Sequence, residues 1–155
     1  MSKNKKYILT VFIIFLVILN IFQLNKIKNY KLITRSNDME FSIQLELICH
    51  GIETIEQAKI KDSVDEKILG AAILASATGQ ASSLYMQTSY YKENESLYAA
   101  LWNLNNTVSN NSKINSLFDK HDFRTLIPII KALKQNPLDK KSTEELYTYF
   151  RYIEF

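Results

Sequence analysis

The stretch from Tyr7 to Leu24 constrains this chain more than any other part of its sequence. It reads YILTVFIIFLVILNIFQL, contains no charged residue and has lysines close to both of its ends. As an α-helix it would be about 27 Å long, close to the hydrocarbon thickness of a bilayer. The stretch therefore predicts a transmembrane helix. Its expected membrane-anchoring positions are Tyr7, Phe12, Phe15, Asn20 and Leu24.

Two other interpretations of this stretch stay open. A cleaved signal peptide also begins with lysines and an apolar core, but it ends at a pair of small residues, and the sequence after Leu19, NIFQLNKIKNYKLI, has no such pair. A buried helix of a soluble domain is the third interpretation. We expect an uncleaved signal anchor. The expected segments are a basic tail (1–6), a transmembrane helix (7–24), a basic juxtamembrane collar (25–37) and a helical, mildly acidic domain (38–155).

Charge is distributed unevenly along the chain. Every acidic residue lies after Ser36, and seven basic residues precede it, so the overall net charge of +3 combines a basic N-terminal segment with an acidic remainder. The collar residues expected to contact lipid headgroups are Lys26, Lys28, Lys31 and Arg35. An acidic domain lacks the basic surface that phosphate binding needs, so a nucleic-acid partner is not expected.

The orientation of the span is less constrained than the span itself. Basic residues mark the cytoplasmic flank, and here both flanks are basic. A short N-terminal tail followed by an apolar core is typical of an export signal, and long domains translocate largely regardless of charge. We expect the N-terminus inside and the C-terminal domain outside the cytoplasm, with the opposite topology as the alternative. The abundance of Lys, Asn, Ile and Tyr suggests a bacterial or phage source.

The remainder of the chain predicts an all-α fold. Only 3 Gly and 2 Pro occur in 155 residues, so tight turns are scarce, and apolar residues recur at helical spacing from Phe41 to Ile55. We expect a small helical bundle or helical-hairpin domain after the transmembrane helix. Capping-box spacing predicts helix starts at Asn37, Ser63 and Ser142. Residues 105–112 predict a loop, residues 114–120 a short helix, and Pro128 places the start of the next helix near Thr125.

Small residues form a second pattern at helical spacing. Ala72, Ser76, Gly79 and Ser83 make a seam that would let another helix approach closely. We expect this seam to pack inside the domain, with an interface between two copies of the chain as the alternative. Leu69, Ile73, Ala77 and Leu84 are expected on the apolar face of the same helix.

Three residues on one predicted helix face are weak metal candidates. Glu46, His50 and Glu53 stand at helical spacing, and two carboxylates with an imidazole can bind a divalent metal. A solvated stripe opposite an apolar face explains them with no metal, and we prefer it because no second Glu/His cluster supplies further ligands. We expect no metal and no cofactor. The single Cys49 is expected to be a buried apolar residue, since it does not form a dyad with His50 by helical geometry.

Aromatic residues gather in the middle and at the end of the chain. Tyr98, Trp102, Tyr149 and Tyr152 are candidates for a partner surface, although they can equally be core residues of a small domain. The sequence contains no Gly-rich phosphate loop, nucleophile elbow or zinc-ligand spacing. We therefore expect a non-enzymatic, single-pass membrane protein that assembles with itself or with an envelope protein. An extracytoplasmic sensor of a small ligand is the alternative, and an unrecognised membrane-bound enzyme is a weaker one.

Overall fold

The computed structural model describes residues 3–109 and 122–151, with the backbone alone for residues 3–10. The described residues are helical and form no strand, as the sequence predicted. The five α-helices are α1 (Lys3–Lys61), α2 (Val64–Tyr85), α3 (Glu95–Val108), α5 (Leu126–Gln135) and α6 (Lys140–Arg151), and a 3-10 turn, η1 (Phe123–Thr125), precedes α5. The chain divides into two compact units, Met1–Arg35 and Ser36–Phe155.

Helix α1 runs without interruption through the position where a new helix was expected to begin. The capping box predicted at Asn37 and Glu40 is therefore wrong. The Asn37 amide instead donates a hydrogen bond to the Gln87 carbonyl (3.2 Å), and the Asp38 carboxylate accepts two from Ser89, through its backbone N–H and its hydroxyl (2.8 Å each). These residues thus attach the α2–α3 loop to α1.

The turn between α1 and α2 combines two capping arrangements. Asp62 adopts a left-handed conformation (φ 52°), and the Ser63 N–H donates to the Ala58 carbonyl (3.0 Å), which closes the C-terminus of α1. The Ser63 hydroxyl accepts a hydrogen bond from the Glu66 N–H (3.4 Å), so the predicted N-cap at Ser63 is confirmed. The chain reverses here with only Asp62 and Ser63 between the two helices.

The helices α1 and α2 make a close backbone approach at two glycines. A Cβ placed on Gly70 would lie 2.8 Å from Ile55 Cγ1, 2.9 Å from Ile55 N and 3.0 Å from the Gly51 carbonyl oxygen. A Cβ on Gly51 would lie 2.9 Å from Leu74 N. Only a residue without a side chain fits at either position, so this pair sets the separation of the two helices.

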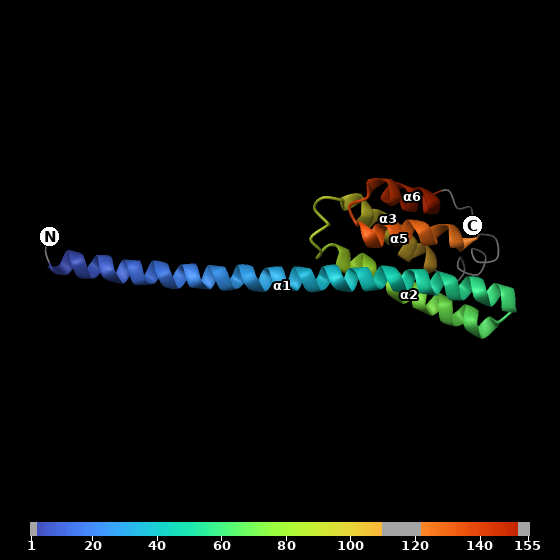
Figure 1. Cartoon of the computed structure of the whole chain (residues 1–155), viewed down its shortest axis with the longest axis horizontal. Coiled ribbons are helices and arrows are strands. Elements are labelled where there is room, and N and C mark those ends of the chain that lie inside the picture. Colours follow the sequence, from blue (N-terminus) through green and yellow to red (C-terminus); the bar gives the residue numbers. More distant parts are fainter. Residues whose placement is uncertain (1–2, 110–121, 152–155) are drawn as a thin grey trace. The chain divides into compact units, whose positions relative to one another are not determined.

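The hydrophobic core lies where α3, α5 and α6 pack on one side of the α1–α2 hairpin (Figure 1). The apolar residues of α1 that were predicted to share a face, from Phe41 to Ile55, are all buried in it. Helix α2 contributes Leu74, Ala77, Ala81 and Tyr85. The predicted α2 face is therefore confirmed only in part: Ala77 is buried, Ile73 and Leu84 are half-buried, and Leu69 is 56% exposed.

The later helix boundaries confirm some predictions and correct others. Helix α3 extends to Val108, so the predicted loop begins too early, and the helix expected at 114–120 lies outside the described residues. Pro128 sits in the first turn of α5, which begins at Leu126, as the sequence predicted. Helix α6 begins at Lys140, before the predicted Ser142, because the Asp139 carboxylate accepts hydrogen bonds from Lys141 N (3.0 Å) and the Ser142 hydroxyl (2.7 Å).

Candidate functional site

The apolar part of α1 is exposed on the surface of the protein. It contains a window of mean hydropathy 1.8 that is long and apolar enough to cross a membrane, and none of that window is buried; it is the one such window in the described part of the chain. Phe12, Phe15 and Leu24 are 55%, 55% and 65% exposed. Tyr7 lies among the residues whose side chains are not described. The Asn20 amide donates to the Leu16 carbonyl (2.9 Å), so its donor has a partner within α1.

The basic collar is equally accessible. Lys26, Lys28, Lys31 and Arg35 are all exposed. No acidic side chain occurs in the sequence of this unit. Four cations on the segment that follows the apolar window form the pattern that favours contact with anionic lipid headgroups.

The weak metal candidates on α1 have cationic neighbours. Glu46 forms an ion pair with Lys134, and Glu53 forms one with Lys131 (3.6 Å), both from α5. The Lys134 ammonium lowers the pKa of the Glu46 carboxyl. His50 is exposed, and no group of three or more His, Cys, Asp or Glu among the described residues could hold a metal ion. The two carboxylates instead connect α1 with α5.

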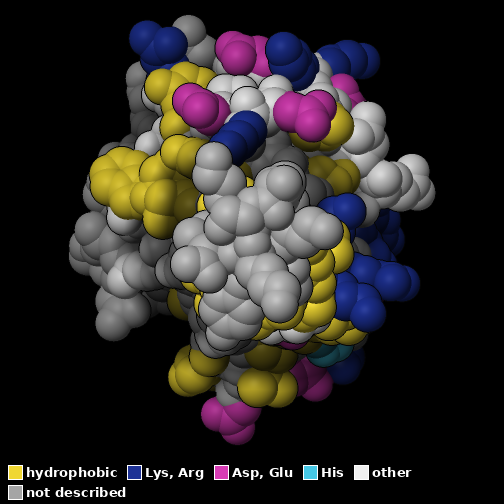
Figure 2. Space-filling model, turned by 90° about the vertical axis from the view of Figure 1, so that its left-hand side faces the viewer, with side chains coloured by type: hydrophobic (Ala, Val, Ile, Leu, Met, Phe, Trp, Pro, Cys, Tyr) yellow, Lys and Arg dark blue, Asp and Glu magenta, His cyan; other side chains and the backbone are white. Residues whose placement is uncertain are grey.

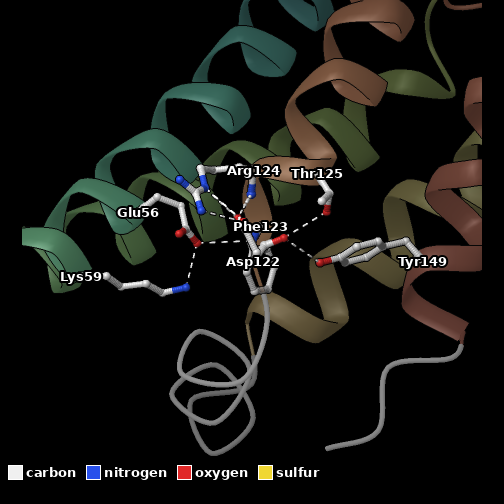
Figure 3. Close-up of polar contacts among 7 residues, drawn as sticks. All are labelled: Glu56, Lys59, Asp122, Phe123, Arg124, Thr125 and Tyr149. Atoms are coloured by element: carbon white, nitrogen blue, oxygen red, sulfur yellow. Dashed lines mark hydrogen bonds and ion pairs between the residues drawn. The ribbon is translucent and has the colours of Figure 1, made fainter.

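The densest polar cluster joins α1 to the start of α5 (Figure 3). One Glu56 carboxylate oxygen accepts from Lys59 Nζ (2.8 Å) and from the Phe123 backbone N–H (3.3 Å). Asp122 caps η1 by accepting from Arg124 N (2.9 Å), and its carboxylate also pairs with the Arg124 guanidinium (2.8 Å). Glu56 is 9% exposed, so its partners compensate for the cost of burying a carboxylate.

The electrostatics of this cluster favour the charged form of Asp122. The Arg124 hydrogen bonds lower the pKa of Asp122 to about 2. The Tyr149 hydroxyl donates to the Asp122 carbonyl (3.4 Å), and burial raises the pKa of Tyr149. A carboxylate held in this way is a poor general acid or base near neutral pH. We therefore assign the cluster to structure: it fixes η1 against α1.

The lone cysteine is buried in the core, as predicted. Cys49 is 3% exposed, and burial raises the pKa of its thiol to about 11. Because the thiolate is the reactive form, Cys49 is poorly suited to nucleophilic chemistry.

The small-residue seam of α2 lies on the side opposite its buried face. Ala72, Ser76 and Ser83 are exposed and Gly79 is half-buried, so the packing inside the domain that was expected for this seam is wrong. A Cβ on Gly79 would meet only Asn105 Oδ1, at 3.5 Å, which is an ordinary contact. The close helix approach occurs at Gly51 and Gly70 instead.

A groove of about 310 Å³ runs between α1 and α2 beside this seam. Its lining residues are Gln44, Leu47, Ala72, Ile73, Ser76, Ala77 and Gln80. Gln44 is 3% exposed, and its amide N–H donates to Glu40 Oε1 (2.6 Å). Gln44 Oε1 is buried and has no hydrogen-bond partner among the described residues. Such a group is costly to leave unsatisfied.

Sequence reasoning missed the groove, although the sequence contains a signal for it. No charged residue occurs from Ile68 to Tyr91, in a chain in which 23% of the residues are charged. A helix whose solvent side lacks charge is typical of a helix that is covered on that side as well. Ile68 and Leu69 continue this uncharged surface and are 62% and 56% exposed.

The candidate interface aromatics divide between core and surface. Phe41, Tyr85, Tyr91 and Tyr98 form a chain of ring contacts with centroids 5.1, 5.9 and 6.3 Å apart. Tyr149 packs against Phe123 and Phe150, whereas Trp102 is 51% exposed. Tyr152 lies outside the described residues. Most of these rings therefore stabilise the core, and Trp102 is available for contact.

Charge on the face shown in Figure 2 is mixed. Lys and Arg side chains lie among Asp and Glu side chains on its upper part, and hydrophobic side chains reach the surface elsewhere on it.

Comparison of the chain with protein-family models gives no match, and comparison with curated proteins and with solved structures gives none either.

Proposed function

We propose that this protein is a single-pass membrane protein whose helical domain acts by assembly and not by catalysis. The observation that carries the proposal is the exposed apolar window of α1, none of which is buried. Exposed apolar patches larger than a few hundred Å² mark membrane or protein interaction sites. The lipid bilayer is the environment that fits a helix of this length, and the collar of Lys26, Lys28, Lys31 and Arg35 fits the headgroup layer that borders it.

The domain supports assembly over ligand sensing or catalysis. Its interior is a continuous apolar cluster that reaches from Phe41 to Phe150, and the groove beside Gln44 is bordered by exposed residues of α1 and α2. The carboxylates of the Figure 3 cluster are occupied by cations and backbone N–H groups. Groups that are already partnered in this way favour a structural role. The proposed orientation has the N-terminus in the cytoplasm and the domain outside it.

Membrane retention tests the anchor. We expect the full chain, expressed in bacteria, to stay in the membrane pellet after alkaline carbonate extraction and to keep its full length. Phe15→Arg with Ile18→Arg should release it, because an arginine at a helix centre costs about 2.5–3.5 kcal/mol of insertion free energy. The control carries two arginines at exposed domain positions, Asn106→Arg and Gln135→Arg, and should remain in the pellet. Release of the unmodified chain would contradict the proposal.

Cysteine labelling tests the orientation. In a Cys49→Ser background, Asn106→Cys places one thiol at an exposed position of α3. A membrane-impermeant maleimide should label it in intact cells from which any outer membrane has been removed. Labelling only after lysis would place the domain in the cytoplasm and overturn this part of the proposal.

A further inference from the structure

The surface that borders the groove consists of exposed side chains that do not pack against the other helices of the domain. We define it by three exposed residues of α2, Ala72, Ser76 and Ser83, and two of α1, Ile43 and Leu47, and call it the α2 face. Helices α3, α5 and α6 pack on the other side of the hairpin. A helix that is apolar or small on all sides is normally covered on all sides.

We propose that the α2 face binds a second copy of this chain, as a two-fold dimer in the plane of the membrane. The proposal deepens the proposed function and rests on it, because the anchor confines both copies to one membrane. That confinement raises their effective concentration, so a smaller interface suffices than the roughly 800 Å² per partner of typical complexes in solution.

Self-association is favoured because the α2 side of this face carries no charge, and Glu40, on its α1 side, is half-buried and accepts a hydrogen bond from Gln44 (2.6 Å). A two-fold axis places residues close to the axis near their own copies, so a charge there would face a like charge. No charged residue occurs from Ile68 to Tyr91, which removes that repulsion.

The shape of the α2 face is also self-complementary. Its α2 side presents the small residues Ala72 and Ser76, and its α1 side presents the larger Ile43 and Leu47, which are 46% and 37% exposed. Under a two-fold axis, the large side chains of one copy can fill the space above the small residues of the other. Small residues at such a contact allow two helix backbones to approach closely.

The hydrogen-bonding groups of the groove complete the argument. Gln44 Oε1 is an acceptor without a partner among the described residues, and its orientation follows from chemistry: reversal of the amide would place two oxygens together at Glu40. The groove also contains donors, since Gln80 Nε2 uses one N–H on Ser76 Oγ (3.1 Å) and keeps a second. In a dimer, the Gln80 amide and Ser76 hydroxyl of one copy would lie over the groove that Gln44 of the other lines, where a turn of the Gln44 side chain brings its oxygen within reach of a donor.

Disulfide crosslinking of the full chain in membranes tests the dimer. In a Cys49→Ser background, Ser76→Cys should form a disulfide-linked dimer on mild oxidation, at least tenfold more than Asn106→Cys on α3, which is exposed but lies off the α2 face. Adding Ala72→Glu should lower the Ser76→Cys dimer at least tenfold, because two carboxylates would meet at the axis. The control Asn106→Glu, at equal expression, should leave the yield unchanged.

A second crosslink identifies any other occupant. A benzophenone maleimide attached to Ser76→Cys should give an adduct of twice the chain mass. An adduct with a different protein or with lipid, or a yield no higher than that of Asn106→Cys, would overturn the dimer. Ala72→Glu should not lower the melting temperature of the domain in detergent, since Ala72 is exposed; a misfolded variant would be replaced by Ser83→Glu, which leaves the Ser76→Cys thiol in place.

Carbonate extraction of the same samples separates the two proposals. A chain that stays in the membrane but does not crosslink through Ser76→Cys contradicts the dimer alone. A chain that crosslinks through Ser76→Cys but is extracted from the membrane contradicts the anchor alone.

Discussion

Replacing Gly70 with alanine tests the packing of the α1–α2 hairpin directly. The added Cβ would lie 2.9 Å from Ile55 N and 3.0 Å from the Gly51 carbonyl oxygen, and backbone atoms of a packed helix cannot rotate away from it. Overpacking of this kind costs about 1–3 kcal/mol, and contact with backbone argues for the upper end. Alanine also gains about 1 kcal/mol of helix propensity over glycine. We therefore expect Gly70→Ala to lower the free energy of unfolding by about 2 kcal/mol.

The matched control is Gly79→Ala in the same helix. It receives the same gain in helix propensity, and its Cβ meets only Asn105 Oδ1 at 3.5 Å. Gly79→Ala should therefore be neutral or stabilising by up to about 1 kcal/mol. The free energies of unfolding of the two variants should differ by about 3 kcal/mol. Because both gain the same helix propensity, this difference measures the cost of the added Cβ where α1 and α2 approach closely. For a domain of this size it corresponds to roughly 10 °C in melting temperature.

Thermal unfolding of the full chain in detergent, followed by circular dichroism, measures this difference. Gly51→Ala should behave like Gly70→Ala, because its Cβ would lie 2.9 Å from Leu74 N. A Gly70→Ala variant that melts at or above the temperature of Gly79→Ala would refute the reasoning and show that the helices separate at little cost.

Three further predictions concern a turn, a buried hydrogen-bond network and the buried thiol. Asp62→Gly should raise the free energy of unfolding by about 0.5–1 kcal/mol in thermal melts, because glycine adopts φ 52° without the Cβ clash; a loss of stability would contradict this. Asn94→Ala should lower it by about 1–3 kcal/mol in urea titrations, because the buried Asn94 amide donates to the Pro137 carbonyl (2.9 Å) and to Thr143 Oγ1 (2.8 Å); unchanged unfolding would count against this network. Cys49 should resist a thiol reagent until the protein unfolds. Burial raises its folded pKa to about 11, above the ordinary thiol value of 9.0, so stability should fall between pH 9 and 11 more than in Cys49→Ala; equal pH dependence would show that the thiol does not contribute.

The fold class and several local features could be predicted because each depends on neighbouring residues. The Ser63 cap requires only Glu66 three residues later, and the start of α5 requires only that Pro128 stand in a first turn. The 4-3 spacing of Phe41, Leu45 and Ile48 identifies one buried face of α1, because polar residues occupy the other. The helix that is long and apolar enough to cross a membrane could likewise be predicted from a single uncharged run.

The buried face of α2 could not be predicted for a physical reason. Periodicity identifies a face only where polar and apolar residues alternate around the helix, and from Ile68 onward α2 carries no charged residue on any side. Leu69 and Ile73 therefore resembled core residues as closely as Leu74 and Ala81 did. The contact between Gly51 and Gly70 depends on the register of the hairpin, which the sequence does not state. The rule that small residues mark close contacts was correct, but it applied to another pair.

The acidic residues of α1 show how one spacing fits two kinds of chemistry. Glu46 and Glu53 share a helix face, which is consistent with metal ligands and equally with ion pairs to a second helix. The choice depends on what lies opposite, and the structure places Lys134 and Lys131 of α5 there. A sequence pattern on one helix therefore identifies a ligand only when the facing helix is known.

The distribution of satisfied polar groups locates the part of the domain that remains available for binding. Glu56, Asp122 and Asn94 each have partners within the domain, so their removal should alter stability before it alters any interaction. Gln44 differs, because its Oε1 is buried and without a partner among the described residues, beside an uncharged helix. An unsatisfied buried acceptor costs about 1–3 kcal/mol, and that cost is relieved when a donor docks over the groove. The proposed docking at the α2 face would offset a cost already present in the free domain, which is why we place the assembly site there and not at the polar groups that the domain already satisfies.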